Sequence, residues 1–119
     1  MEEWTTPPSY LGAASFIAKL DASGAEVWHA FIPDTGPYGL QALAADVGGN
    51  VYATGRSELP WGTPIDPYAG GVDVFVTKLN NSGKFVWNTF MGSPGSDGAA
   101  AIALDRGGNV YVAGGSSAT

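Results

Sequence analysis

His29 is the only histidine among the 119 residues, so any histidine-ligated metal site or Ser/His/Asp triad would have to use it. Asn88 takes its place in a second, similar segment of the chain, which favours an ordinary hydrogen-bonded strand residue. The chain has no cysteine, and no serine lies on the Gly-x-Ser-x-Gly turn that exposes a nucleophile. We predict no catalytic residue, no cofactor and no enzymatic activity.

A pair of glycines precedes an apolar run twice, in "GGNVY" at 48–52 and again at 107–111. A phosphate-binding loop needs a lysine followed by serine or threonine, and a helix behind it. Here asparagine, valine and tyrosine follow the glycines and enter a predicted strand. We interpret both glycine pairs as turns.

Four carboxylates are expected in loops, where they could join backbone carbonyls around calcium: Asp34, Asp66, Asp73 and Asp97. No closely spaced aspartate triplet of the EF-hand kind accompanies them, and nothing local imposes the paired geometry of an acid/base couple. No metal site is predicted.

Aromatic side chains in connectors and loops are the most plausible functional residues. Trp4, Tyr10, Tyr38, Trp61 and Tyr68 could pack against neighbouring units or stack on a sugar ring. Packing or a subunit interface is the favoured interpretation. Tyr38, Trp61 and Tyr68 are the candidates for ligand-facing aromatics, with glycans as the ligand class.

The charge balance bears on the class of partner. Eleven acidic and five basic residues give a net charge of −6, which disfavours binding to nucleic acid and to anionic membrane surfaces. No run approaches the ~20 apolar residues of a membrane span, and the first residues lack the basic and apolar regions of a signal peptide. We expect neither nucleic-acid binding nor membrane insertion.

The chain contains an internal repeat with an offset of 59 residues. Residues 16–57 align without a gap onto 75–116 and are identical at 20 of 42 positions. Residues 59 positions apart in this alignment are called counterparts below. We divide the chain into a first repeat, 1–57, and a second repeat, 58–119, which together form one structural unit.

Each repeat is predicted to hold four short strands rich in β-branched and aromatic residues. They cover 16–20, 26–31, 40–45 and 51–54 in the first repeat, and 75–79, 85–90, 100–104 and 110–113 in the second. We expect the four strands of one repeat to form one antiparallel sheet. Trp28, Tyr52, Trp87 and Tyr111 recur inside these strands and are predicted core.

Each predicted hairpin turn has an acceptor at its first position and a glycine where the backbone needs a positive φ. The acceptors are Asp21, Asp46, Asn80 and Asp105, and the glycines are Gly24, Gly49, Gly83 and Gly108.

These residues resemble the prokaryotic propeller repeat called SBBP. The resemblance rests on "FIAKL" and "FVTKL", Trp28 and Trp87, "ALAAD" and "AIALD", and "GNVYATG" and "GNVYVAG". It covers essentially the whole chain, although the aspartate-rich loop of the family is weakened to "IPDTGPYG" and only two repeats are present. The resemblance implies an all-β fold, a β-propeller of four-stranded antiparallel blades with two blades per chain.

Two blades leave apolar faces open, whereas repeat proteins usually need at least ~3 repeats and propellers close at about four to eight blades. We expect head-to-tail homo-oligomerisation, with three or four chains favoured for six or eight blades and a filament as the open alternative. A join of "VYVAGGSSAT" to the "MEEWTTPP" of a neighbour would imitate the internal "VYATGRSELPWGTP". The expected interface residues are Glu3, Trp4, Tyr10, Val110, Tyr111, Ala113, Gly115 and Ser116.

The sequence therefore predicts a structural, self-assembling module whose main partner is itself. An extracellular or cell-surface location is favoured. A lectin-like propeller with one carbohydrate site per blade is the alternative function, and a fragment of a longer multi-repeat surface protein is a third interpretation.

Overall fold

The computed structural model describes residues 15–32, 39–57, 64–67, 71–92 and 97–116. These residues form eight β-strands and no helix: β1 (Ser15–Leu20), β2 (Glu26–Ile32), β3 (Leu40–Ala45), β4 (Val51–Ser57), β5 (Asp73–Leu79), β6 (Phe85–Met91), β7 (Asp97–Leu104) and β8 (Val110–Ser116). The predicted strands and the all-β class are confirmed. In the described part of the chain no helix is long and apolar enough to cross a membrane.

Four tight turns join the strands into antiparallel hairpins. Gly24, Gly49, Gly83 and Gly108 all have positive φ, between 78° and 89°, as the turn pattern predicted. In the first turn the Gly24 N–H donates to the Asp21 carbonyl, and the Asp21 N–H donates to the Ala25 carbonyl. The other three turns repeat this pair of hydrogen bonds.

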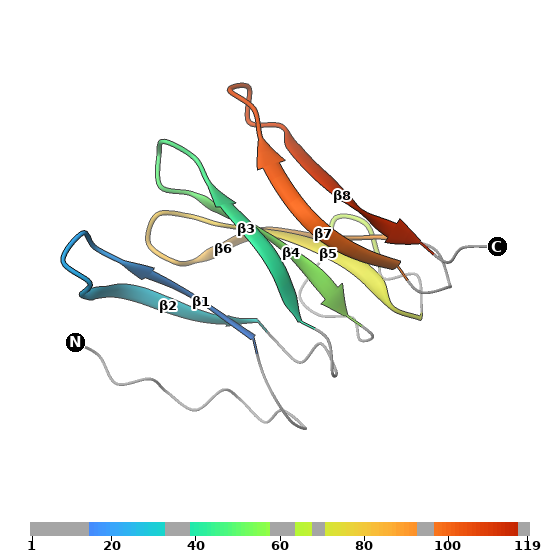
Figure 1. Cartoon of the computed structure of the whole chain (residues 1–119), viewed down its shortest axis with the longest axis horizontal. Helices are drawn as coiled ribbons and strands as arrows, with labels where there is room; N and C mark the ends of the chain where they lie inside the picture. The colour runs from blue at the N-terminus through green and yellow to red at the C-terminus, as the bar shows by residue number, and fades with distance from the viewer. Residues whose placement is uncertain (1–14, 33–38, 58–63, 68–70, 93–96, 117–119) are drawn as a thin grey trace.

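The strands form three antiparallel sheets. A middle sheet has the order β3-β4-β5-β6, and β1-β2 and β7-β8 each form a two-stranded sheet. Figure 1 shows the three sheets in chain order across the molecule. None of the sheets in the described ranges closes on itself.

The expectation that each repeat forms its own four-stranded sheet is wrong. The middle sheet joins the second hairpin of the first repeat to the first hairpin of the second repeat, through β4 and β5, which pair from Val51↔Leu79 to Ser57↔Asp73. The division at 57/58 is a boundary of the sequence repeat that falls inside a sheet. The physical reason is pairing across the 58–72 connector, which a local strand pattern does not reveal.

The two faces of the middle sheet pack against different hairpins. On one face, Phe75 and Leu79 of β5 belong to a core cluster with Ile17 of β1 and Trp28 of β2. On the other face, Val74 and Val76 pack against residues of β6, β7 and β8. Because side chains alternate along a strand, one strand serves both cores.

Candidate functional site

The side chains considered for catalysis or metal binding lie apart or already have partners. His29 Nδ1 lies 3.1 Å from the Glu26 carboxylate three residues earlier on β2, and its ring meets Phe31 edge-on. In the ranges that the structure describes, no three His, Cys, Asp or Glu side chains gather as a metal site. His29 is thus placed as a hydrogen-bonded strand residue.

The loop placement expected for the four carboxylates is partly wrong. Asp73 and Asp97 are the first residues of β5 and β7, and Asp73 is completely buried. Asp66 is exposed in a bend, where its N–H donates to Thr89 Oγ1 at 3.1 Å. Asp34 lies outside the described residues. Strand formation extends further than predicted because the pairing of β4 with β5 continues to Ser57↔Asp73.

In each repeated "GGNVY" segment, the aspartate that precedes the glycines accepts hydrogen bonds from the residues of the hairpin turn. In the second repeat, Asp105 Oδ1 accepts from the Gly107 and Asn109 backbone N–H groups, both at 2.9 Å. Asp105 Oδ2 accepts from the Asn109 side chain and the Tyr111 hydroxyl, also both at 2.9 Å. The first repeat has the same arrangement around Asp46, with Tyr52 at 3.4 Å.

These hydrogen bonds stabilise the ionised form of the turn carboxylates. The Asn109 side chain, then the Asn109 N–H and the Tyr111 hydroxyl, lower the pKa of Asp105 to about 2. The pKa of Asp46 is also lowered, first by the Asn50 side chain. Since both oxygens accept hydrogen bonds within the hairpin, this carboxylate fixes the turn and is poorly placed to serve as a general base.

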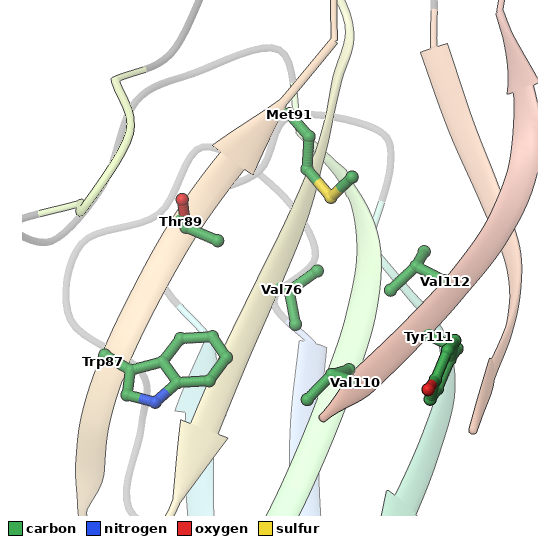
Figure 2. Close-up of a pocket in the computed structure, with 7 residues that line it drawn as sticks. All are labelled: Val76, Trp87, Thr89, Met91, Val110, Tyr111 and Val112. Carbon is green, nitrogen blue, oxygen red and sulfur yellow. The ribbon is translucent and has the colours of Figure 1, made fainter. Parts of the chain in front are cut away.

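A groove of about 430 Å³ lies between the middle sheet and β8. Val76 of β5 and Trp87, Thr89 and Met91 of β6 form one wall, and Val110, Tyr111 and Val112 of β8 form the other. Figure 2 shows Val76, Trp87, Met91, Val110 and Val112 around one space, with the Tyr111 ring on the other side of β8. The lining residues are mainly apolar, and the hydroxyls of Thr89 and Tyr111 are engaged with the Asp66 N–H and with Asp105, so the groove suits a nonpolar occupant.

Five of the eight predicted interface residues lie on β8, and the other three lie outside the described residues. Val110 and Tyr111 line the groove, and Ala113 and Gly115 are exposed further along β8. Ser116 is the last residue of β8. Glu3, Trp4 and Tyr10 lie outside the described residues, as do the candidate ligand-facing aromatics Tyr38, Trp61 and Tyr68.

Sequence reasoning missed part of both walls of the groove. It predicts Trp87 as core and does not single out Val76, Met91 or Val112. A usable signal exists, because their counterparts Ile17, Ile32 and Ala53 all belong to the first core cluster. Predicting the groove from the contacts of these counterparts, however, requires knowing which strands share a sheet, and the sequence did not reveal that.

No protein-family model matches the chain, and no curated protein matches it. Function is therefore inferred from the residues and their geometry.

Proposed function

We propose that this chain is a structural module that self-assembles head to tail into a β-propeller, with further copies of itself as its partner. The observation that carries the proposal is the sheet order: a four-stranded sheet built across the two repeats, flanked by two sheets of two strands each. Each two-stranded sheet corresponds to half of the middle sheet. Joining the half-sheets of successive copies would complete a four-stranded unit at every junction.

The resemblance to SBBP repeats supports the same proposal, since that family forms propellers from such units. Three or four copies would supply six or eight four-stranded sheets, within the usual size range of propellers. A contact between unlike surfaces closes into a ring when its rotation divides the circle, and otherwise continues as a filament.

Light scattering on the purified chain at several concentrations tests the proposal. We expect a mass three or four times 12.2 kDa, or a larger filament, with native β-sheet circular dichroism. A folded particle of 12.2 kDa that persists at high concentration would contradict self-assembly. Electron microscopy of the same sample then separates rings from filaments.

The carbohydrate-binding alternative stays a prediction, because its three aromatic residues lie outside the described ranges. The extracellular location and the non-enzymatic character likewise stay predictions.

A further inference from the structure

β8 and β1 are the two strands whose counterparts lie inside a sheet. In the order β3-β4-β5-β6, the strands β3 and β6 are edges, and β4 and β5 are interior. Their counterparts are β7, β2, β8 and β1, respectively. Among the described strands, however, β8 pairs only with β7, and β1 pairs only with β2. An interior strand has two neighbours, so β8 and β1 each lack one relative to their counterparts.

Side-chain exposure marks the same two strands. Leu20 of β1 is 58% exposed, whereas its counterpart Leu79 is fully buried. Tyr111 of β8 is 58% exposed, whereas its counterpart Tyr52 is only 4% exposed. The repeat does not impose such differences everywhere.

Val27 and Val86 provide the comparison on β2 and β6. Both are 52% exposed, as expected for counterparts that face solvent in either repeat. Leu20 and Tyr111 thus differ from their counterparts on the two strands that lack a neighbour, whereas Val27 and Val86 do not differ from each other.

The first core cluster shows how a groove of this shape is filled. Its members come from three places: Ile17, Trp28 and Ile32 of the β1-β2 hairpin, Val51 and Ala53 of β4, and Phe75, Leu79 and Phe90 of β5 and β6. The groove beside β8 contains the counterparts of the first two sets, namely Val76, Trp87, Met91, Val110 and Val112. The counterparts of the third set, Phe16, Leu20 and Phe31, lie on β1 and β2.

Trp28 and Trp87 also differ in what covers the indole ring. The Trp28 indole Nε1–H donates to the Asn81 carbonyl at 3.1 Å, and the ring lies against the backbone of Gly83. The counterpart ring, Trp87, lines the groove. The counterpart glycine, Gly24, has open space where a Cβ would be. A β1-β2 hairpin of another copy, docked in the groove, would place its Gly24 against Trp87.

The chain cannot fill its own groove with β1. Ile17 and Trp28 hold the β1-β2 hairpin against the face of the middle sheet that carries Phe75 and Leu79. The groove opens on the opposite face, next to Val76. The missing strand must come from elsewhere, and the chain itself carries one with the matching residues.

We infer that β8 of one copy pairs antiparallel with β1 of the next copy, in the register of β4 with β5. That register places Val110 opposite Leu20 of the next copy and Val112 opposite Ala18 of the next copy, as Val51 lies opposite Leu79 and Ala53 opposite Thr77. Phe16, Leu20 and Phe31 of the next copy then fill the groove. The inference rests on the proposed self-assembly and specifies its contact.

Paired cysteines test the register, because the natural chain contains none. A disulfide requires Cα atoms about 4.4–6.8 Å apart, which directly opposed residues of an antiparallel pair satisfy. We expect a chain with both Ala18→Cys and Val112→Cys to form covalent multimers under mild oxidation, which reductant reverses on denaturing gels. Mixing the two single variants should give a crosslinked pair.

The control shifts the register by two residues on the same face. In a chain with Ala18→Cys and Val110→Cys the two Cα atoms would be diagonal neighbours, about 7–8 Å apart, and should crosslink at least about fivefold more slowly. Equal or faster crosslinking of the shifted pair would overturn the inferred register. Full crosslinking of the Ala18→Cys variant with itself would show a symmetric contact and would overturn the head-to-tail pairing.

Light scattering on the same samples separates the two proposals. A monomeric parent chain overturns both self-assembly and the strand pairing. An oligomeric parent whose matched cysteines fail to crosslink overturns the pairing alone, and self-assembly stands.

A substitution without cysteine provides a second test. Leu20→Ser removes an exposed apolar side chain that the inference buries, and Val27→Ser removes one of similar exposure that it leaves in solvent. We expect Leu20→Ser to raise the concentration at which half of the assembly dissociates by about tenfold or more, and Val27→Ser to change it less than about twofold. Equal effects of the two variants would overturn the burial of Leu20, and circular dichroism verifies that both fold.

Discussion

At the scale of single residues, the turns depend on a side-chain acceptor that replaces missing backbone partners. Asp21, Asp46, Asn80 and Asp105 each accept from backbone N–H groups two or four residues later in the chain. The sequence predicted the acceptors and the positive-φ glycines, since both follow from local turn chemistry. It did not predict that Tyr111 reaches back to Asp105, because that contact depends on where the returning strand places the ring.

Asp105→Asn should make the chain less sensitive to acid. The pKa of Asp105 is lowered to about 2 in the folded chain, against an ordinary value of 3.8. A depressed folded pKa contributes stability above about pH 4, and that stability is lost as the pH falls toward 2. Asparagine still offers an acceptor oxygen, as Asn80 does naturally.

Urea unfolding at pH 7, pH 4 and pH 2.5, at one protein concentration, measures this effect. We expect the parent to lose more stability than Asp105→Asn between pH 4 and pH 2.5. Acid sensitivity should persist in part, because the pKa values of Asp21 and Asp46 are also lowered. Identical pH profiles for the two chains would contradict the assignment.

Gly83→Ala should cost more than a positive φ alone explains. A Cβ at Gly83 would lie 2.6 Å from Trp28 Cδ2, so the indole would have to move away from Asn81. Gly108→Ala is the matched control, since Gly108 has φ of 83° and a Cβ there would meet nothing within 4 Å. We expect both to lose about 1–2 kcal/mol to backbone strain, and Gly83→Ala at least about 1 kcal/mol more, in the free energy of unfolding. Equal losses would show that the Trp28 contact adds nothing.

At the scale of strands and sheets, the local pattern located the eight strands but not their grouping. A four-strand repeat allows two groupings: the four strands of one repeat can form a sheet, or the last two strands of one repeat can join the first two of the next. The alternation of side chains within each strand is the same in both groupings. The structure has the second grouping, in which β4 pairs with β5. The groove could not be predicted for the same reason, because its two walls belong to different sheets.

Buried hydroxyls link β4 to β5 and β5 to β6. Thr54 Oγ1 donates to the Phe75 carbonyl at 2.9 Å, and Thr77 Oγ1 donates to the Trp87 carbonyl at 2.9 Å. Both threonines are fully buried, so neither hydroxyl can turn to water instead.

Thr54→Val keeps the shape of the side chain and removes this donor. We expect a loss of about 1 kcal/mol in the free energy of unfolding, the usual net value of such a hydrogen bond. Chemical denaturation at fixed protein concentration measures it. A valine variant as stable as the parent would show that burying the methyl group offsets the lost bond.

At the scale of the whole molecule, the 59-residue offset and the sheet order together show that β8 and β1 each have one neighbouring strand fewer than their counterparts β4 and β5. Each of the two outer sheets corresponds to one half of the middle sheet. The two outer sheets carry complementary surfaces, with exposed apolar side chains on β1 and an apolar groove beside β8. A surface that fits its own missing half favours assembly between identical chains over binding to an unrelated partner.

A circular permutant should let β7-β8 and β1-β2 pair within a single chain. Residues 39–119 followed directly by 1–38 would place β1-β2 after β8, joined by a connector of 17 residues, against the 15 residues of 58–72 between β4 and β5. The permutant should therefore contain two four-stranded sheets, β3-β4-β5-β6 and β7-β8-β1-β2. With Ala18→Cys and Val112→Cys added, the disulfide should form within the chain, so that the mass on a denaturing, non-reducing measurement stays that of one chain. The unpermuted double variant is the control and should give covalent multimers. Covalent multimers of the permutant as well would show that β8 does not take β1 in this register, because a strand tethered beside its partner pairs ahead of one that must arrive from solution.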